Sequence, residues 1–246
     1  GLRREKLRAL TSNFEENIFD NSVVVIDEAH NFISRIVNKI EKEASLVLDD
    51  KGKKDRVPTA TALILYDMLL SAKNVRIVLL TGTPIVNYPN EIGILFNILR
   101  GYIKTWNIPL NVSTSHSDTN SKLQRIFSKE KYIDYFNYGK NKVLSITRNP
   151  FGFENKYSGK SGYEGVNNKD SRMSVISDAD FEKRILDVLQ KNDIGVNKHA
   201  IKIKMYKALP DKLDEFRNMF IQSNTGNVEN VELFKRRIIG LTSYFR

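Results

Sequence analysis

The first hundred residues alternate between short apolar runs and stretches in which apolar residues recur at helical spacing. Residues 22–26 read Ser-Val-Val-Val-Ile, and residues 75–80 form a second apolar run. Short β-branched runs of this kind are typical of parallel strands that are buried on both faces. Helical spacing follows each run and also marks residues 59–72, and Asn90 is placed to cap the last helix. This order predicts an α/β domain with a parallel sheet over residues 1–100.

After residue 100 the pattern changes, and residues 101–246 are predicted to form a mainly helical extension with a small β element. Four aromatic residues lie at helical spacing, which favours packing in a core over stacking on bases: Tyr132, Tyr135, Phe136 and Tyr138. The Gly- and Asn-rich stretch near 155–171 predicts a loop. The remaining expectations are a helix capped by Asp178, a half-exposed strand over 201–206, a helix that starts at Pro210 and a last helix over 231–245.

The composition narrows the class of protein. With 41% hydrophobic and 28% charged residues, the chain resembles an ordinary globular protein. It has no cysteine, which excludes disulfides and cysteine-ligated metal sites, and no apolar run approaches the ~20 residues of a membrane span. We therefore expect an intracellular protein with no membrane partner.

The formal net charge of +10 has two explanations. A basic surface binds nucleic acid because counterions are released when phosphates are neutralised. Alternatively, an A/T-rich genome supplies the charge, because lysine codons are A/T-rich and Lys outnumbers Arg by 24 to 15. The charge alone leaves both explanations open.

Two polar motifs follow the two apolar runs, at the strand ends where parallel α/β sheets bind ligands. The first is Asp27-Glu28-Ala29-His30. A strand-end Asp27 is suited to hold Mg²⁺ beside a triphosphate, and an adjacent Glu28 is suited to polarise water for attack on the γ-phosphoryl group. His30 is placed to contact the next strand end. The alternative is that both carboxylates only cap the following helix.

The second motif, Thr81-Gly82-Thr83-Pro84, ends the second apolar run. Small hydroxyl residues around Gly82 would allow a partner loop to approach the backbone closely. On its own this motif is equally typical of a strand-to-helix turn. Because the carboxyl ends of neighbouring parallel strands meet at one edge of a sheet, we expect the two motifs to lie together.

Together the motifs resemble motifs II and III of DEAH-box superfamily 2 helicases and translocases. Residues 23–30 look like the Walker B motif, and residues 79–85 look like motif III. Val86 stands where the Swi/Snf-type branch usually has Gln. The spacing of four further residues is similar to that branch: Asn87, Glu91, Leu95 and Leu99.

The later chain resembles the same proteins in places. Residues 209–212 look like the segment that leads into the interlobe region of the Swi/Snf-type branch. Residues 236–245 look like helicases of large cytoplasmic DNA viruses, namely the poxvirus early-transcription-factor and nucleoside-triphosphatase helicases and their giant-virus relatives.

The resemblance implies a partial RecA-like lobe of the P-loop NTPase class in an ATP-dependent helicase or translocase. ATP and Mg²⁺ are the implied cofactors, with Asp27 as the metal ligand and Glu28 as the water-activating residue. His30, Thr81, Gly82 and Thr83 would couple this site to nucleic acid, either DNA or RNA. Viral transcription or genome handling is the implied setting, in host cytoplasm or virion, with transcription machinery as a further partner.

Two parts that such motors need are not found in this sequence. The family's phosphate-binding loop precedes motif II, but only 26 residues precede Asp27 and none forms G-x-x-x-x-G-K-[ST]. Gly159-Lys160-Ser161 does not fit, because Glu154 stands where that motif requires glycine. Arginines typical of a second helicase lobe are missing as well. We therefore expect this chain alone to hydrolyse little ATP.

Two other classes stay open. The chain would be a non-catalytic nucleic-acid-binding or structural module if the motor fold has lost its phosphate loop. It would be the motor of a restriction-type nuclease if a carboxylate–lysine cluster were present, but the sequence offers no convincing one. Arg148 is a candidate for a nucleic-acid contact outside the two motifs, and the alternative is an exposed charge on a loop.

Overall fold

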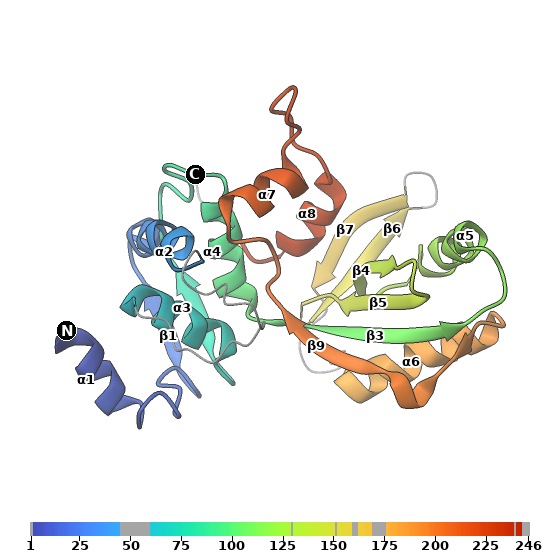
Figure 1. Ribbon diagram of the computed structural model, residues 1–246, viewed down its shortest axis with the longest axis horizontal. Helices are drawn as coiled ribbons and strands as arrows, with labels where there is room; N and C mark the ends of the chain where they lie inside the picture. The colour runs from blue at the N-terminus through green and yellow to red at the C-terminus, as the bar shows by residue number, and fades with distance from the viewer. Residues whose placement is uncertain are drawn as a thin grey trace. The chain divides into compact units, whose positions relative to one another are not determined.

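The computed structural model describes residues 2–44, 60–128, 130–150, 152–158, 162–168, 176–238 and 240–242 (Figure 1). The chain has a mixed α/β structure and divides into two compact units. Unit 1 comprises residues 1–102 and 207–231, and unit 2 comprises residues 103–206 and 232–246. No helix in the described ranges is long and apolar enough to cross a membrane.

Unit 1 contains the elements predicted for the first hundred residues. Strands β1 (Val23–Ile26) and β2 (Arg76–Leu79) pair in parallel, from Val23 opposite Arg76 to Ile26 opposite Leu79. The helices are α1 (Leu2–Leu10), α2 (Ala29–Ala44), α3 (Thr61–Ser71), α4 (Asn90–Arg100) and α7 (Leu213–Phe220). The predicted order of strand, helix, helix, strand, helix is confirmed.

The prediction that both strands are buried on both faces is wrong. Val23 is 66% exposed and Val25 is 59% exposed, and they share a face with the exposed Val78 and Leu80. The other face is half-buried. The physical reason is that the described part of the chain supplies a sheet of two strands, with helices against one face and nothing against the other.

The segment that returns from unit 2 is fastened to unit 1 by buried polar side chains. Asn97 on α4 donates from Nδ2 to the Leu209 carbonyl (2.9 Å) and accepts at Oδ1 from the Leu209 amide (2.8 Å). Asn90 does not cap α4: Pro89 holds the N-cap position, and the Asn90 side chain donates to the Asp211 carbonyl. The predicted helix at Pro210 begins later, at Leu213.

Unit 2 is built on an antiparallel sheet, which corrects the prediction of a mainly helical extension. The strand order is β4 (Ile133–Tyr138), β5 (Val143–Arg148), β3 (Ile103–Asn111), β8 (Gly195–Val196), and β9 (Lys202–Tyr206) also pairs with β3. Helices α5 (His116–Phe127) and α6 (Asp178–Lys191) carry buried apolar residues into the same core as one face of this sheet. Burial along β3 largely alternates, which is the period of a strand. The apolar residues of this region also recur at helical spacings in places, and these spacings led to the prediction of helices.

The four aromatic residues expected on a helix lie on or beside β4. Tyr138 is buried, Phe136 and Tyr132 pack against the unit 2 core, and Tyr135 points to the opposite face of the sheet. The prediction that these residues pack in a core is therefore confirmed for most of them, but they lie on or beside a strand and not on a helix. Aromatic residues fit a pleated, half-buried surface, which is why they are common in strands.

Other boundaries in unit 2 also differ from the prediction. The described part of the stretch near 155–171, which was predicted to be a loop, belongs to two antiparallel strands, β6 (Phe153–Ser158) and β7 (Gly162–Asn168). Gly159-Lys160-Ser161 lies outside the described residues. Ser177, and not Asp178, caps α6, because its hydroxyl accepts from the Asp180 amide. The last helix, α8 (Val231–Ile238), is shorter than predicted, and residues 243–246 are not described.

The chain enters and leaves the sheet of unit 2 at neighbouring positions. Ile103, the first residue of β3, is paired with Tyr206, the last residue of β9. Residues 103–206 are therefore an insertion between two segments of unit 1, with both ends side by side. Such placement of the ends is typical of inserted domains.

Candidate active site

The ends of β1 and β2 bring the two polar motifs together, as their positions in the sequence predict. Leu80 donates its amide to the Ile26 carbonyl (2.9 Å), and Ala29 donates its amide to the Leu80 carbonyl (3.0 Å). These two hydrogen bonds continue the parallel ladder beyond the last strand residues. Asp27-Glu28 and Thr81-Gly82-Thr83 consequently leave the sheet at the same edge.

The acidic pair lies in a tight, exposed turn between β1 and α2. Glu28 has φ of +48°, a left-handed conformation that is uncommon for residues other than glycine. The turn is supported on both sides, because the Glu28 amide donates to Asp27 Oδ1 (2.9 Å) and its carbonyl accepts from the Asn31 amide (2.9 Å). Both carboxylates are exposed, so they are accessible to a ligand from solvent.

His30 connects the two motifs. Its Nδ1 lies 3.2 Å from Glu28 Oε2 and 3.1 Å from Thr81 Oγ1. Thr81 Oγ1 in turn accepts a hydrogen bond from the Thr83 amide (3.2 Å). The three side chains thus form an unbroken chain of polar contacts from the Glu28 carboxylate to the backbone after β2.

Glu91, in the first turn of α4, holds the loop that follows Thr83. Glu91 is 1% exposed, and its carboxylate accepts from the amides of Val86 (2.6 Å) and Asn87 (3.1 Å), and from the Ser34 hydroxyl on α2 (3.3 Å). One buried carboxylate therefore ties α2, α4 and the loop into one body. The sequence singled out Glu91 by its spacing alone, and its positioning role became visible only from these contacts.

The expected close approach at Gly82 has no counterpart among the described residues. A Cβ atom built on Gly82 would meet nothing within 4 Å. Within the described ranges no three His, Cys, Asp or Glu side chains gather in the manner of a metal site. Mg²⁺ needs no such cluster, because it keeps several waters and is often held by one or two carboxylates together with substrate phosphates.

Arg148 is engaged within unit 2. Its guanidinium donates to the Ile176 carbonyl (2.7 Å) and lies 3.0 Å from the carboxylate of Asp178, and the side chain is largely buried. These contacts tie the end of β5 to the start of α6. The geometry therefore gives Arg148 a structural role within unit 2.

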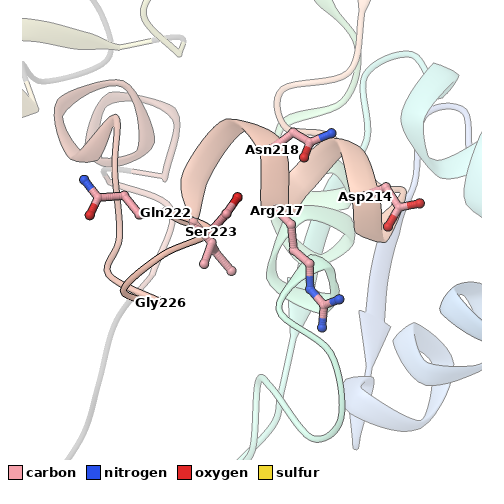
Figure 2. A pocket seen from close by; sticks show the side chains of 7 residues that line it. Asp214, Arg217, Asn218, Gln222, Ser223 and Gly226 are labelled. Atoms are coloured by element: carbon pink, nitrogen blue, oxygen red, sulfur yellow. The ribbon is translucent and has the colours of Figure 1, made fainter.

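A surface pocket of about 470 Å³ lies along α7 and the turn after it, away from these motifs in the sequence. Figure 2 shows Asp214, Arg217 and Asn218 on the helix, with Gln222, Ser223 and Gly226 beyond it. None of the predicted site residues lines this pocket. Its lining combines one acid, one base, polar side chains and the apolar Ile221, which indicates no particular chemistry.

Comparisons with known proteins give partial matches to viral proteins. Over 83 residues the chain is 34% identical to an Acanthamoeba polyphaga mimivirus protein whose name marks it provisionally as an ATP-dependent RNA helicase; the match covers 32% of this chain and 8% of that protein. Over 132 residues it is 28% identical to a protein of African swine fever virus named as a homolog of termination factor NPH-I, covering 44% of this chain and 16% of that protein.

The chain spans about a sixth or less of the length of the curated relatives it matches. No family model matches the chain, and no solved structure matches it. The chain is thus similar to viral helicase-like proteins, which agrees with the resemblance drawn from its two motifs.

Proposed function

We propose that this chain is part of the motor of a nucleic-acid-dependent ATPase, a helicase or translocase that acts in viral transcription or genome handling. Unit 1 would be the C-terminal half of a RecA-like lobe that carries motifs II and III. The observation that supports this most directly is the contact of His30 with both Glu28 and Thr81, because it joins an acidic strand end to the neighbouring strand end. The names of the viral relatives point in the same direction.

In this proposal the exposed carboxylates have separate roles. Asp27, held by the Glu28 amide, offers carboxylate oxygen of the kind that Mg²⁺ prefers, and the ion would offset phosphate charge when bound. Glu28 would accept a hydrogen bond from the attacking water and orient its oxygen toward the γ-phosphorus. The new bond joins water oxygen to phosphorus as a proton of the water passes to the Glu28 carboxylate, the bond between phosphorus and the β–γ bridging oxygen breaks, and ADP leaves.

The ring nitrogen of His30 that contacts both Glu28 and Thr81 would couple the nucleotide site to the loop after β2. His30 Nδ1 has a single hydrogen at most in the neutral ring, so it cannot fully satisfy Glu28 and Thr81 at once. A change in the Glu28 position after hydrolysis would therefore alter the hydrogen bonding of Thr81, which holds the Thr83 amide. In this way the state of the nucleotide would reach the loop that Glu91 fixes to α2 and α4.

The exposed face of β1 and β2 also supports the proposal of a larger lobe. Val23, Val25, Val78 and Leu80 present an apolar surface to solvent on strands of a type that is normally covered by helices. Further strands or helices of a complete RecA-like lobe would bury it.

A non-catalytic module is the second candidate. It is favoured by the exposure of Asp27 and Glu28, because no phosphate-binding element faces them among the described residues. In that case the polar contacts of His30 would only stabilise the turn.

The test is the ATPase rate of the full-length protein with and without nucleic acid, comparing wild type with Glu28→Gln. Loss of a catalytic base lowers rates by about 10²- to 10⁴-fold. Glu16→Gln is the matched control, because it makes the same chemical change at an exposed position of unit 1 outside both motifs. Stimulated turnover that only Glu28→Gln abolishes supports the motor. Turnover that is negligible in every variant, with nucleic-acid binding retained, favours the non-catalytic module.

A further inference from the structure

The excess of basic over acidic residues is confined to unit 2. Residues 103–206 and 232–246 hold 22 Lys and Arg against 12 Asp and Glu, whereas residues 1–102 and 207–231 hold 17 of each. Unit 2 thus accounts for the entire net charge of +10, and unit 1 is neutral. A bias in codon usage would raise lysine in both units, so it does not explain this division.

The two faces of the unit 2 sheet differ in chemistry. Trp106, Ile108, Leu144 and Ile146 line the face that shares its core with α5 and α6. The other face, which we call the polar face, carries a row of polar residues across four paired strands: Lys202 on β9, Asn107 on β3, Ser145 on β5 and Asn137 on β4. Lys204 lies two residues along β9 on the same face, opposite Thr105.

Most of this row is accessible. Lys202, Lys204 and Asn137 are exposed, and Asn107 and Ser145 are half-buried. Helix α8 lies at the β4 side of the face, where the Arg237 guanidinium is 5.5 Å from the Tyr135 ring centre. Within the part of the chain that the structure describes, the ammonium groups of Lys202 and Lys204 form no ion pair.

The middle of the row is held in place by hydrogen bonds within the sheet. Ser145 donates its hydroxyl to Asn107 Oδ1 (2.8 Å), and Asn107 Nδ2 donates to the Lys202 carbonyl (3.3 Å). At the β4 end of the row, the exposed Asn137 carries an amide of the kind that commonly contacts phosphate and sugar oxygens, and such contacts position a nucleic-acid backbone without reading its sequence. The two lysines add the charge on which affinity for that backbone depends.

We propose that the polar face of unit 2 is a binding surface for the phosphate backbone of nucleic acid, with Lys202 and Lys204 as its charged contacts. This surface is made of residues of unit 2, whereas the strand-end site is made of residues of unit 1. It requires no nucleotide, so it does not depend on the proposed ATPase. It also deepens the proposed function, because it would give the motor a second contact with nucleic acid.

The test compares two double variants of the chain in binding to a fluorescent oligonucleotide over a range of salt concentrations. Lys202→Ala/Lys204→Ala should weaken binding to a single strand by about 10- to 30-fold at 0.1 M salt and should reduce the slope of log affinity against log salt by about 1.4, since each phosphate contact contributes about 0.7. Single-stranded DNA, single-stranded RNA and duplex are measured separately to identify the preferred track.

The matched control is Lys183→Ala/Lys191→Ala. Both lysines are exposed on α6, which packs on the opposite face of the sheet, and the variant removes the same charge. An unchanged affinity in this control, with the loss confined to Lys202→Ala/Lys204→Ala, supports the polar face. Equal losses in both variants, or no binding by wild type, overturn it. Circular dichroism confirms that both variants are folded.

The outcome is independent of the proposed function. Glu28→Gln should leave binding and its salt slope unchanged in this assay, whatever its effect on ATP hydrolysis. Conversely, if the polar face fails the test, the ATPase assay with Glu16→Gln as control still decides the motor.

Discussion

Unit 1 contains equal numbers of acidic and basic residues, whereas unit 2 holds the whole excess of basic residues. Their sheets also differ, since the strands are parallel in unit 1 and antiparallel in unit 2. In unit 1 the polar chemistry lies at the strand ends, and in unit 2 it lies across a sheet face. A net charge taken over the whole chain hides this difference, because the excess of basic residues and the candidate catalytic residues lie in different units.

Buried polar contacts serve a similar purpose in both units, although they differ in kind. In unit 1 a neutral amide, Asn97, fastens the returning segment. In unit 2 an ion pair fastens α8, because Arg237 Nη1 lies 2.8 Å from Oδ2 of the fully buried Asp134. Each of the following predictions changes one unit and tests whether the other is affected.

The largest effect on stability is expected from Arg237→Ala in unit 2. Removing one partner of a buried pair typically costs about 3–5 kcal/mol, because the remaining charge is left without compensation. Hydrogen exchange should show faster exchange in β4 and β5, with protection in β1 and β2 unchanged. Lys235→Ala, on an exposed position of the same helix, is the control. Uniform loss of protection in both units would mean that they unfold as one.

Asn97→Ala should destabilise unit 1 by about 3 kcal/mol. It leaves the amide and carbonyl of Leu209 without partners, and each unsatisfied buried group costs about 1–3 kcal/mol. Chemical denaturation measures the loss, and hydrogen exchange should locate it in residues 207–220. Asn90→Ala, on the same helix, removes one hydrogen bond in place of three and should cost less. Equal losses would contradict the assignment of Asn97 as the main fastening.

Glu91→Gln should have a moderate effect, of about 1–2 kcal/mol, because hydrogen bonds to a charged acceptor are worth about 1.5–3 kcal/mol and the amide retains part of them. Faster hydrogen exchange at Val86 and Asn87 should accompany the loss. If the loop also positions Thr83 for coupling, nucleic-acid stimulation of the ATPase should fall while the unstimulated rate remains. Unchanged exchange at these two amides would rule out the positioning role.

The smallest effect concerns pH. Burial, followed by the nearby Asp211 charge, raises the pKa of Tyr66 well above its usual value of about 10. The unfolded chain therefore loses this proton before the folded chain does, so the stabilising contribution is complete below about pH 10 and is lost as the pH rises further. Urea denaturation between pH 9 and about 11 should show stability falling, with a shallower fall in Tyr66→Phe. Tyr88→Phe, which removes the same hydroxyl at an exposed position, is the control.

The sequence was most informative where several characteristic residues stood close together along the chain. The run before Asp27 and the run before Thr81 specified two strands, their parallel relation and the meeting of their ends, because strand-end positions follow directly from an α/β order. The contact of His30 with Thr81 follows from the same geometry. The roles in catalysis and coupling assigned to these residues stay predictions.

Unit 2 was difficult for the opposite reason. Its strands are stabilised by partners far along the chain, such as Trp106 on β3 opposite Ile146 on β5 and Ile203 on β9. Spacing within a window does not contain such pairings. The prediction of buried strands failed in unit 1 because the face that carries Val23 and Val25 is exposed. A run of valines looks the same in the sequence whether or not its second face is covered.

The pairing of Ile103 with Tyr206 has a consequence for the folding of unit 1. An unstructured insertion of about a hundred residues would raise the entropy cost of closing the chain between α4 and Leu209 by about 3–4 kcal/mol relative to a short turn, because that cost grows with the logarithm of loop length. Once unit 2 has folded, its ends are already adjacent, and most of this cost disappears. Unit 1 then folds as though a tight turn joined residues 102 and 207.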